Sequence, residues 1–285
     1  MCARKIKAEQ GFTLVELLVV IAIVALLISI IVPSLNIARQ KASSMACMSN
    51  VRHLSLGWYM YQQDHNGDMV SARMNGQPRS GGRVPGWVNQ PYDSAGNLLS
   101  RTQESPAVTD EDEIRGIRDG ALFPYVEDPG AYNCPSDRVI SVHDGTERFR
   151  PYTIASGLAS DHSERELYNF NNMRSPSTKF TFLEVAEQRN YVQGMFVLGT
   201  PIWSGGNYSV WWNPVAINHG DASTMGYADG HAETRRWRER HTFERIEKLQ
   251  EQGGGGYGID RTSGINSTND EDLRFLERGW PGLKR

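Results

Sequence analysis

The feature that most constrains this chain is an apolar segment of 21 residues, 12–32, whose only charged member is Glu16. Sixteen of these residues are Leu, Ile, Val or Phe. At about 1.5 Å per residue, a helix of this length spans roughly 31 Å, about the thickness of the hydrocarbon core of a bilayer. The apolar side chains contribute about −5 to −10 kcal/mol to insertion, which exceeds the roughly +3 kcal/mol that a central charge costs. The segment therefore predicts a membrane-spanning helix in a lipid bilayer, despite its carboxylate.

The residues before this segment predict its orientation. Arg4, Lys5 and Lys7 precede it, with only Glu9 against them, and short basic flanks stay on the cytoplasmic side. The chain after residue 32 is then expected outside the cytoplasm. A conventional secretory signal is the alternative, but its apolar region has about 7–15 residues and precedes its small-residue cleavage site. Here the small residue, Gly11, lies before the apolar run.

The junction between leader and apolar segment reads Gly11-Phe12-Thr13-Leu14-Val15-Glu16-Leu17-Leu18. This stretch resembles the processing site of the type IV prepilin family, which includes the pseudopilins of type II secretion, and the resemblance covers about residues 4–33. It implies that a membrane-embedded prepilin peptidase cuts between Gly11 and Phe12 and methylates the new amino terminus. Glu16 would become the fifth residue of the mature chain, and Pro33 the twenty-second, where many pilins also carry a proline.

The position of Glu16 agrees with that resemblance on physical grounds. A carboxylate inside hydrocarbon needs a partner or takes up a proton. Cleavage would create an amine on Phe12, and methylation would retain its positive charge. We expect Glu16 to pair with the Phe12 amine of an adjacent subunit and so to set the register of a fibre. The alternative is a simple membrane anchor that carries an incidental Glu near one interface.

Beyond the apolar segment, the pattern predicts one continuous helix from about Phe12 to Gln63. Pro33 lacks an amide hydrogen and is expected to kink this helix rather than end it. Apolar residues then recur at steps of four, three, four and three, which places them on one helical stripe. The stripe consists of Cys47, Val51, Leu54, Trp58 and Tyr61. We therefore expect a leader at 1–11, a transmembrane half at 12–33, an amphipathic half at 34–63 and an exported globular domain at 64–285.

The helix is followed by an Asp-x-Asn-x-Asp pattern at residues 64–68. Such a pattern begins some calcium loops, but an EF-hand loop also needs a Glu at its twelfth position. That position is Asn75. The pattern therefore favours a plain turn over a calcium site.

The net charge bears on the possible partners of the chain, and the cysteine content bears on its covalent cross-links. The formal net charge is −3, and loss of residues 1–11 removes three cations and one anion, which leaves −5. A mildly acidic exported domain does not suggest nucleic-acid binding. Cys2 would be lost with the leader, so the mature chain keeps Cys47 and Cys134. We predict a disulfide between them, closing a loop of about 88 residues; two buried free thiols are the alternative.

The exported domain is expected to be a small sheet with long loops. Residues 72–113 are poor in apolar periodicity and predict an irregular or mobile excursion. Thr242–Gln250 predicts a short helix, Ser263–Asp272 a polar loop, and apolar residues of 273–280 a tail that docks on the domain. Asp229-Gly230 predicts a two-residue hairpin turn. The expected strands are Tyr152–Ala155, Lys179–Val185, Met195–Leu198, Thr224–Ala228 and His231–Thr234.

His219 is followed by nine residues and then Asp229-Gly230. This spacing resembles the H-x9-DG element at the carboxyl end of a large group of prepilin-like proteins. Those proteins also share segments like Cys47…Asn50-Val51-Arg52 and Cys134-Pro135-Ser136-Asp137. The paired amino-terminal and carboxyl-terminal resemblances are more specific together than either is alone.

One cluster in this region invites a catalytic interpretation. His219, Asp221, Asp229 and His231 lie within thirteen residues, and imidazoles with carboxylates bind zinc. However, residues of opposite parity along a strand face opposite sides, and turn chemistry explains Asp229. We therefore assign no catalytic residue, no metal site and no cofactor, and expect structural histidines. The aromatic residues within 203–212 are either core residues or a platform for a sugar or partner.

Together these features predict an α+β, pilin-like fold: a long amino-terminal helix packed on a small antiparallel sheet with large loop insertions. The resemblance implies a structural, non-enzymatic subunit that is stored in the inner membrane and assembled into a type II secretion pseudopilus or a type IV pilus-like fibre. Its implied partners are the prepilin peptidase, other pilin or pseudopilin subunits and the inner-membrane assembly platform. The alternative is a membrane-anchored exported binding protein or metalloenzyme that uses the prepilin export route.

Overall fold

The structure is a computed structural model that describes residues 14–79, 82–99, 107–139, 145, 147–159, 167–186, 194–199, 209–251 and 265–282. The chain divides into two compact units, residues 1–42 and residues 43–285. Helix α1 (Leu14–Asp64) contributes to both units. It begins with the first described residue and ends one residue after the predicted Gln63.

The amino-terminal half of α1 is a single uninterrupted apolar helix. Pro33 lies inside α1, which continues past it, as predicted. The most apolar window of 18 residues has a mean hydropathy of 3.2, and α1 is the one helix of the described chain with the length and composition to cross a membrane. Ten of the residues 14–32 are Val or Ile, which are not strong helix formers, so the lipid favours the helix here because it pairs the backbone polar groups within one segment.

The carboxyl-terminal part of α1 belongs to the second unit and packs against the rest of it through the predicted stripe. Cys47, Val51, Leu54 and Trp58 are fully buried, and Tyr61 is 6% exposed. The neighbours on the opposite side of the helix are exposed. The helical period therefore predicted this packing face correctly.

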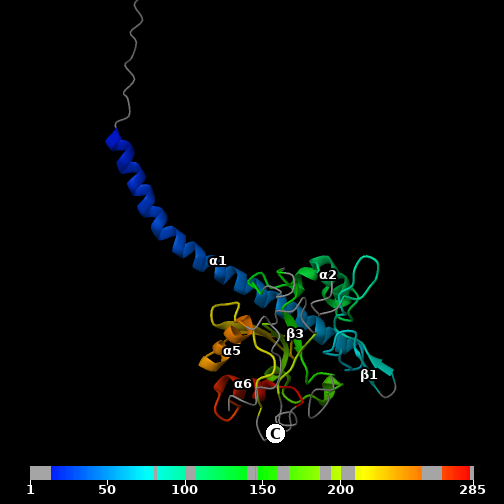
Figure 1. Ribbon diagram of the computed structural model, residues 1–285. Helices are drawn as coiled ribbons and strands as arrows, with labels where there is room; N and C mark the ends of the chain where they lie inside the picture. The colour runs from blue at the N-terminus through cyan, green and yellow to red at the C-terminus, as the bar shows by residue number, and fades with distance from the viewer. Residues whose placement is uncertain are drawn as a thin grey trace, which may run out of the picture. The chain divides into compact units, whose positions relative to one another are not determined.

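The second unit is built on a five-stranded sheet with the order β5-β3-β4-β6-β7, in which β3 is labelled in Figure 1. Its strands are β3 (Tyr152–Ala155), β4 (Phe180–Glu184), β5 (Met195–Phe196), β6 (Ala222–Tyr227) and β7 (Ala232–Arg236). The pairs β3–β4, β4–β6 and β6–β7 are antiparallel, whereas β3 pairs with β5 in parallel. The sheet is thus mixed rather than purely antiparallel, and the predicted α+β fold is confirmed.

The two faces of this sheet belong to different core clusters. Tyr152, Ile154 and Phe182 join the α1 stripe on one face. Ala155 and Leu183 belong to the cluster on the other face, together with residues of the carboxyl-terminal tail. A register irregularity between Phe180 and Leu183 lets Phe180 join this second cluster although it shares the parity of Phe182. Bulges of this kind re-aim side chains along a strand.

A glycine on β6 sets the close approach of helix to sheet. A Cβ atom at Gly226 would lie 2.2 Å from Ser55 Oγ and 3.0 Å from Val51 Cγ1. Ser55 Oγ also lies 3.4 Å from Thr181 Oγ1 on β4. The helix therefore contacts the sheet backbone directly at this point, which only a residue without a side chain permits.

The carboxyl-terminal tail covers the face of the sheet opposite α1. Helix α5 spans Arg240–Glu251, close to the predicted 242–250, and α6 spans Glu271–Gly279. Leu273, Leu276 and Trp280 are fully buried, so the predicted docking of the tail is confirmed. The predicted polar loop 263–272 runs too far, because its last two residues already belong to α6. Asp270 caps that helix by accepting a hydrogen bond from the Leu273 amide.

Residues 72–113, in their described part, are largely irregular, as predicted, but not without regular structure. They contain the strands β1 (Gln77–Arg79) and β2 (Gly82–Val84), and α2 (Asp110–Arg118) begins within them. Trp87 and Val88 are fully buried in the core cluster that contains the α1 stripe, so part of this irregular segment packs on the domain. The sequence signal that was missed for α2 is a capping box at Thr109 and Asp112, which uses Asp where Glu or Gln is usual. The remaining short elements are α3 (Phe123–Val126), η1 (Pro129–Tyr132), η2 (Phe170–Asn172) and η3 (Pro176–Thr178).

The hairpin β6–β7 is present, but its turn differs from the prediction. Gly226 pairs with Ala232, and the Tyr227 amide donates to the His231 carbonyl. Residues 228–230 therefore form a three-residue loop rather than a two-residue turn. Within this loop Gly230 alone has a positive φ, of 90°, as in hairpins that end in a bulge glycine.

Candidate functional site

The first candidate site is the exposed apolar surface of α1 in the amino-terminal unit. Every Leu, Ile and Val side chain from Leu14 to Val32 is 48–81% exposed. Ser29 Oγ donates a hydrogen bond to the Leu26 carbonyl, so this hydroxyl needs no donor or acceptor outside its own helix. Glu16 lies in the first described turn, while Gly11 and Phe12 lie outside the described residues. Apolar exposure on this scale requires lipid or other protein to cover it.

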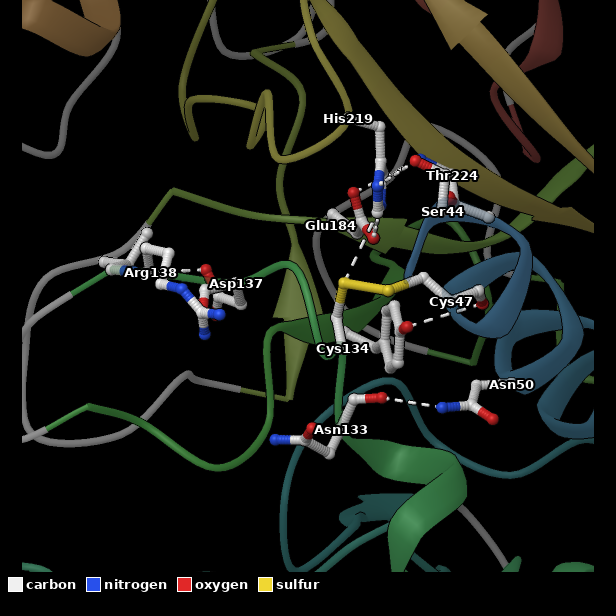
Figure 2. Close-up of a disulfide and its surroundings, with 12 residues drawn as sticks. Ser44, Cys47, Asn50, Asn133, Cys134, Asp137, Arg138, Glu184, His219 and Thr224 are labelled. Atoms are coloured by element: carbon white, nitrogen blue, oxygen red, sulfur yellow. Dashed lines mark hydrogen bonds and ion pairs between the residues drawn. A yellow bond between two sulfur atoms is a disulfide. The ribbon is translucent and has the colours of Figure 1, made fainter. Parts of the chain in front are cut away.

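The second candidate site is a buried polar cluster where α1 meets the sheet. Ser44 and Cys47 lie one turn apart on α1, and Cys47 forms the predicted disulfide with Cys134 (Figure 2). The Cα atoms of the two cysteines are 5.1 Å apart, and the cysteines are 87 residues apart in sequence. Tyr152 on β3 donates from its hydroxyl to the Cys47 carbonyl over 3.4 Å. The disulfide therefore fixes the loop that carries Cys134 to the long helix, and the Tyr152 hydrogen bond joins β3 to the same turn of that helix.

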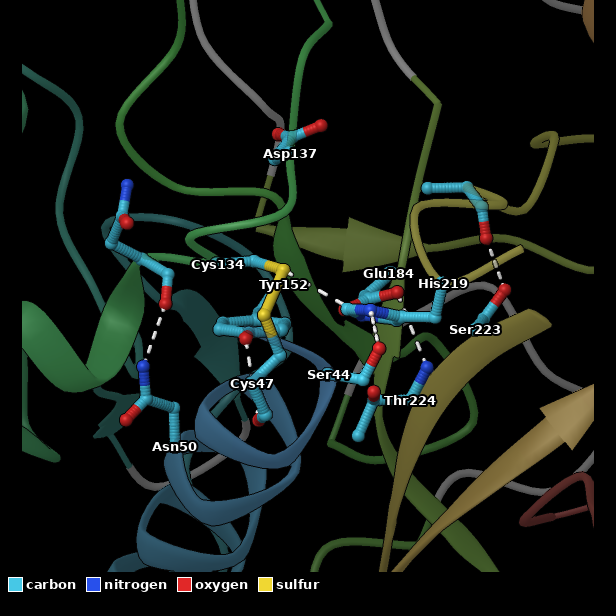
Figure 3. Close-up of polar contacts among 12 residues, drawn as sticks. Ser44, Cys47, Asn50, Cys134, Asp137, Tyr152, Glu184, His219, Ser223 and Thr224 are labelled. Atoms are coloured by element: carbon cyan, nitrogen blue, oxygen red, sulfur yellow. Dashed lines mark hydrogen bonds and ion pairs between the residues drawn. A yellow bond between two sulfur atoms is a disulfide. The ribbon is translucent and has the colours of Figure 1, made fainter. Parts of the chain in front are cut away.

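His219 and Glu184 complete the cluster from the sheet side. His219 Nε2 lies 3.0 Å from Glu184 Oε1 and 3.6 Å from Cys134 Sγ, whereas Nδ1 lies 3.1 Å from Ser44 Oγ (Figure 3). The side chains of His219 and Glu184 are 1% and 0% exposed. The Thr224 amide on β6 donates to the second carboxylate oxygen of Glu184. The imidazole is thus held from three sides by α1, β4 and the disulfide.

Burial dominates the electrostatics of this cluster. It raises the pKa of Glu184 by penalising the ionised carboxylate, while the hydrogen bond and the charge of His219 oppose the rise. A 3.0 Å contact between Oε1 and Nε2 requires a proton, or a cation in its place, between two atoms that otherwise both accept. The contact therefore marks Glu184 and His219 as one coupled unit.

The segments around the two cysteines are held in place by further hydrogen bonds. Asn50 Nδ2 donates to the carbonyls of Asn133 and Gly130, over 2.8 and 3.2 Å. Asp137 accepts a buried hydrogen bond of 2.6 Å from Arg148 Nε, and both side chains are almost fully buried. Asn50, Asp137 and His219 all belong to segments that carried the second sequence resemblance. The fold therefore brings parts of all three segments to one place.

The four metal candidates considered from the sequence do not come together. His219 and Asp221 precede β6, whereas Asp229 and His231 follow it. A six-residue strand is about 20 Å long, so one ion cannot bind both pairs. His231 Nδ1 instead contacts Asp229, and both side chains are well exposed. Sequence reasoning missed Glu184 and Ser44, because neither stands near His219 in the chain.

The Asp-x-Asn-x-Asp segment forms a turn whose oxygens bond to residues elsewhere in the domain. Asn66 and Gly67 have positive φ values of 55° and 86°. Asn169 Nδ2 donates to the Asn66 carbonyl and to Asp68 Oδ1, while Asp64 accepts from the Tyr125 hydroxyl. The carboxylates of Asp64 and Asp68, two of the oxygen ligands that a calcium loop would use, therefore each accept a hydrogen bond from the protein.

Comparison with known proteins bears on the first candidate site, the apolar amino-terminal segment of α1. Residues 6–32 match the family model described as the prokaryotic N-terminal methylation motif. The amino terminus of this chain is type IV prepilin-like. A stretch of 57 residues, 20% of this chain, is 40% identical to the type IV wide pilus major component PilA4 of Thermus thermophilus and covers 44% of that protein. The chain thus spans less than half the length of this relative. No solved structure matches the chain.

The prepilin-like motif and the exposed apolar helix suggest membrane anchoring before assembly. Pilin-like proteins are typically non-enzymatic structural subunits, and this chain has the long helix and the sheet of that fold class. The motif ends at residue 32, so it says nothing about the buried cluster around His219.

Proposed function

We propose that this prepilin-like chain is a structural subunit of a type II secretion pseudopilus or a type IV pilus-like fibre. The observation that carries the proposal is the combination of the methylation motif at 6–32 with a helix whose aliphatic side chains are 48–81% exposed from Leu14 to Val32. In the membrane, lipid covers these side chains. In a fibre, the same helices of neighbouring subunits replace the lipid.

The domain organisation follows from this proposal. The leader 1–11 is cytoplasmic and is removed by the prepilin peptidase between Gly11 and Phe12. Residues 12–33 span the inner membrane, 34–63 form the amphipathic half of the helix, and 64–285 form the exported domain. Pro33 introduces a kink between the two halves. Assembly then requires an inner-membrane platform and neighbouring pilin or pseudopilin subunits.

Glu16 is the residue proposed to set the register between subunits. It lies four residues from the Phe12 amine that cleavage would create, and its carboxylate is otherwise expensive in hydrocarbon. Pairing with the methylated amine of an adjacent subunit neutralises both charges without water. A register fixed by one ion pair is specific because the rest of the segment 12–32 carries no other charge.

The test is Glu16→Val in the native host, with Ser29→Ala as the matched control. Ser29→Ala also removes a polar group from the apolar segment, but one that bonds only to its own helix. We expect both variants to be cleaved after Gly11, as shown by amino-terminal sequencing. Only Glu16→Val should lose sheared or secreted fibres on immunoblots.

Two results would contradict the proposal at different points. Fibres of normal yield from Glu16→Val would remove the pairing role. An amino terminus at Met1 in the wild-type protein would remove peptidase processing, and with it the assembly function.

A further inference from the structure

We propose that reduction of the Cys47–Cys134 disulfide opens a binding site for one Zn²⁺ ion, with Cys47, Cys134, Glu184 and His219 as its ligands. The two Sγ atoms, one carboxylate oxygen and one imidazole nitrogen all lie within 4.8 Å of one another. They come from α1, the loop after η1, β4 and the loop before β6, as Figure 3 shows. This inference does not depend on fibre assembly.

The spacing of the ligand atoms is close to that of a tetrahedral zinc site. Zn–S bonds of about 2.3 Å and Zn–N or Zn–O bonds of about 2.0–2.1 Å place S and N roughly 3.5 Å apart, and N and O roughly 3.3 Å apart. Here Cys134 Sγ and His219 Nε2 are 3.6 Å apart, and Nε2 and Glu184 Oε1 are 3.0 Å apart. The main change needed is separation of the two sulfurs, which follows when their bond is broken. The Cα atoms, 5.1 Å apart, already bring both thiolates within reach of one ion.

The surrounding hydrogen bonds leave the correct ligand atoms available. The Thr224 amide engages Glu184 Oε2 over 3.2 Å, so Oε1 faces His219 and the sulfurs. Ser44 Oγ contacts His219 Nδ1, which leaves Nε2 directed into the cluster. Outer partners that fix a carboxylate and an imidazole in this way are typical of metal sites. Three of the four ligand residues are buried, and the His219 side chain is 1% exposed.

The donor set also selects the kind of cation. Two thiolates, an imidazole and a carboxylate suit Zn²⁺, whereas Ca²⁺ and Mg²⁺ prefer oxygen ligands. Without an ion, two thiols, a carboxylate and an imidazole would share a space from which water is excluded. A divalent ion offsets two of the three negative charges that the deprotonated ligands carry. The protein therefore keeps its helix joined to the loop that carries Cys134 in either state, by a covalent bond or by a metal.

The exchange of the disulfide for a zinc site takes two steps, reduction and metal binding. A dithiol or phosphine reductant supplies two electrons to the disulfide, and the S–S bond breaks to give two thiols. The dithiol is oxidised to a disulfide, or the phosphine takes oxygen from water to become its oxide. Binding of Zn²⁺ then displaces one proton from each thiol and takes the place of the proton between Glu184 and His219.

The test compares one protein in two redox states. The full chain is purified in detergent, and half is reduced with a water-soluble phosphine that is removed under anaerobic conditions. Both halves receive excess Zn²⁺, are desalted, and are analysed for zinc by mass spectrometry. We expect about one ion per chain in the reduced sample and only background in the oxidised one. Co²⁺ added in place of Zn²⁺ should give the absorption bands of tetrahedral thiolate ligation.

Variants identify the ligands. Glu184→Gln and Ser44→Ala should each weaken zinc binding to the reduced chain by about 10-fold or more, measured by competition with a chromogenic chelator. The matched control is His231→Ala, which removes an exposed histidine that also contacts a carboxylate but lies at the far end of β6. Its zinc affinity should equal that of the wild type.

Three outcomes would overturn the proposal. The reduced wild-type chain could bind no more zinc than the oxidised chain. The Cys47→Ser/Cys134→Ser chain could bind as much as the reduced wild type. His231→Ala could lose as much affinity as Glu184→Gln. Circular dichroism of each sample establishes that a loss of zinc is not a loss of fold.

Discussion

Glu113 on α2 is expected to make the stability of the second unit depend on pH. Its side chain is buried, with the residue 4% exposed, and Oε1 accepts a hydrogen bond of 2.9 Å from the Phe149 amide. Burial raises the pKa of Glu113 to about 7 from 4.5, although the Arg150 and Arg148 guanidinium groups and backbone hydrogen bonds oppose the rise. The folded chain therefore holds this proton more tightly than the unfolded chain.

The direction and the size of the effect follow from proton linkage. Between about pH 4.5 and about 7, Glu113 loses its proton in the unfolded chain but keeps it in the folded chain. The free energy of unfolding therefore falls as the pH rises through this range. Above it, the loss is on the order of 3 kcal/mol, from about 1.4 kcal/mol for each pH unit between the two pKa values. Below about pH 4.5 both states are protonated and the effect vanishes.

The perturbation is Glu113→Gln, which keeps the shape and an acceptor for the Phe149 amide but cannot ionise. Urea unfolding is followed by tryptophan fluorescence from pH 4.5 to 8 for both proteins in the same detergent. The difference in unfolding free energy, wild type minus variant, should fall by on the order of 3 kcal/mol across this range. Because other titrating groups are common to both proteins, their contributions cancel in the difference. A difference that stays constant with pH, or that rises, would refute the reasoning.

Three further changes test the packing of the second unit by urea unfolding. Cys47→Ser/Cys134→Ser, measured with a chelator present, should lose up to about 4–5 kcal/mol, because the bond joins residues 87 apart in sequence; an unchanged midpoint would mean that the disulfide constrains nothing. Gly226→Val should cost about 1–3 kcal/mol or more, since its Cβ would lie 2.2 Å from Ser55 Oγ, and a neutral result would show that the helix can move away freely. Leu276→Ala should cost about 2–5 kcal/mol because Leu276 is fully buried; a cost near zero would mean that α6 does not hold the sheet.

Features that depend on neighbouring residues could be predicted from the sequence. The membrane-length helix and the stripe from Cys47 to Tyr61 follow from apolar residues at helical spacing, and the docking of the tail follows from its apolar content, although its helix α6 was not predicted. The disulfide was predictable because only two cysteines remain after the leader, and one lies on the buried stripe. Each inference needs the chain only over a few turns, or a count of one residue type.

Weaker local signals gave partial answers. The β6–β7 hairpin was correct in kind, but its register was off by one, since Asp229-Gly230 fits both a two-residue turn and a three-residue loop with a bulge glycine. Tertiary packing decided between them: the Ala228 amide donates to the Lys179 carbonyl at the end of the neighbouring strand. Helix α2 was missed because its capping box uses Asp112 in place of Glu or Gln and because its buried face is short.

The buried cluster was decided by tertiary structure alone. His219 contacts Ser44, which is 175 residues away, Cys134, 85 away, and Glu184, 35 away. No sequence periodicity connects these positions. The order of the strands and the parallel β3–β5 pair determine which loops lie next to each other, and both depend on the packing of the whole sheet. The sequence by itself determined that this chain has a helix able to anchor in a bilayer. Only the fold determined which side chains surround its disulfide, since burial brings together polar groups that the chain keeps far apart.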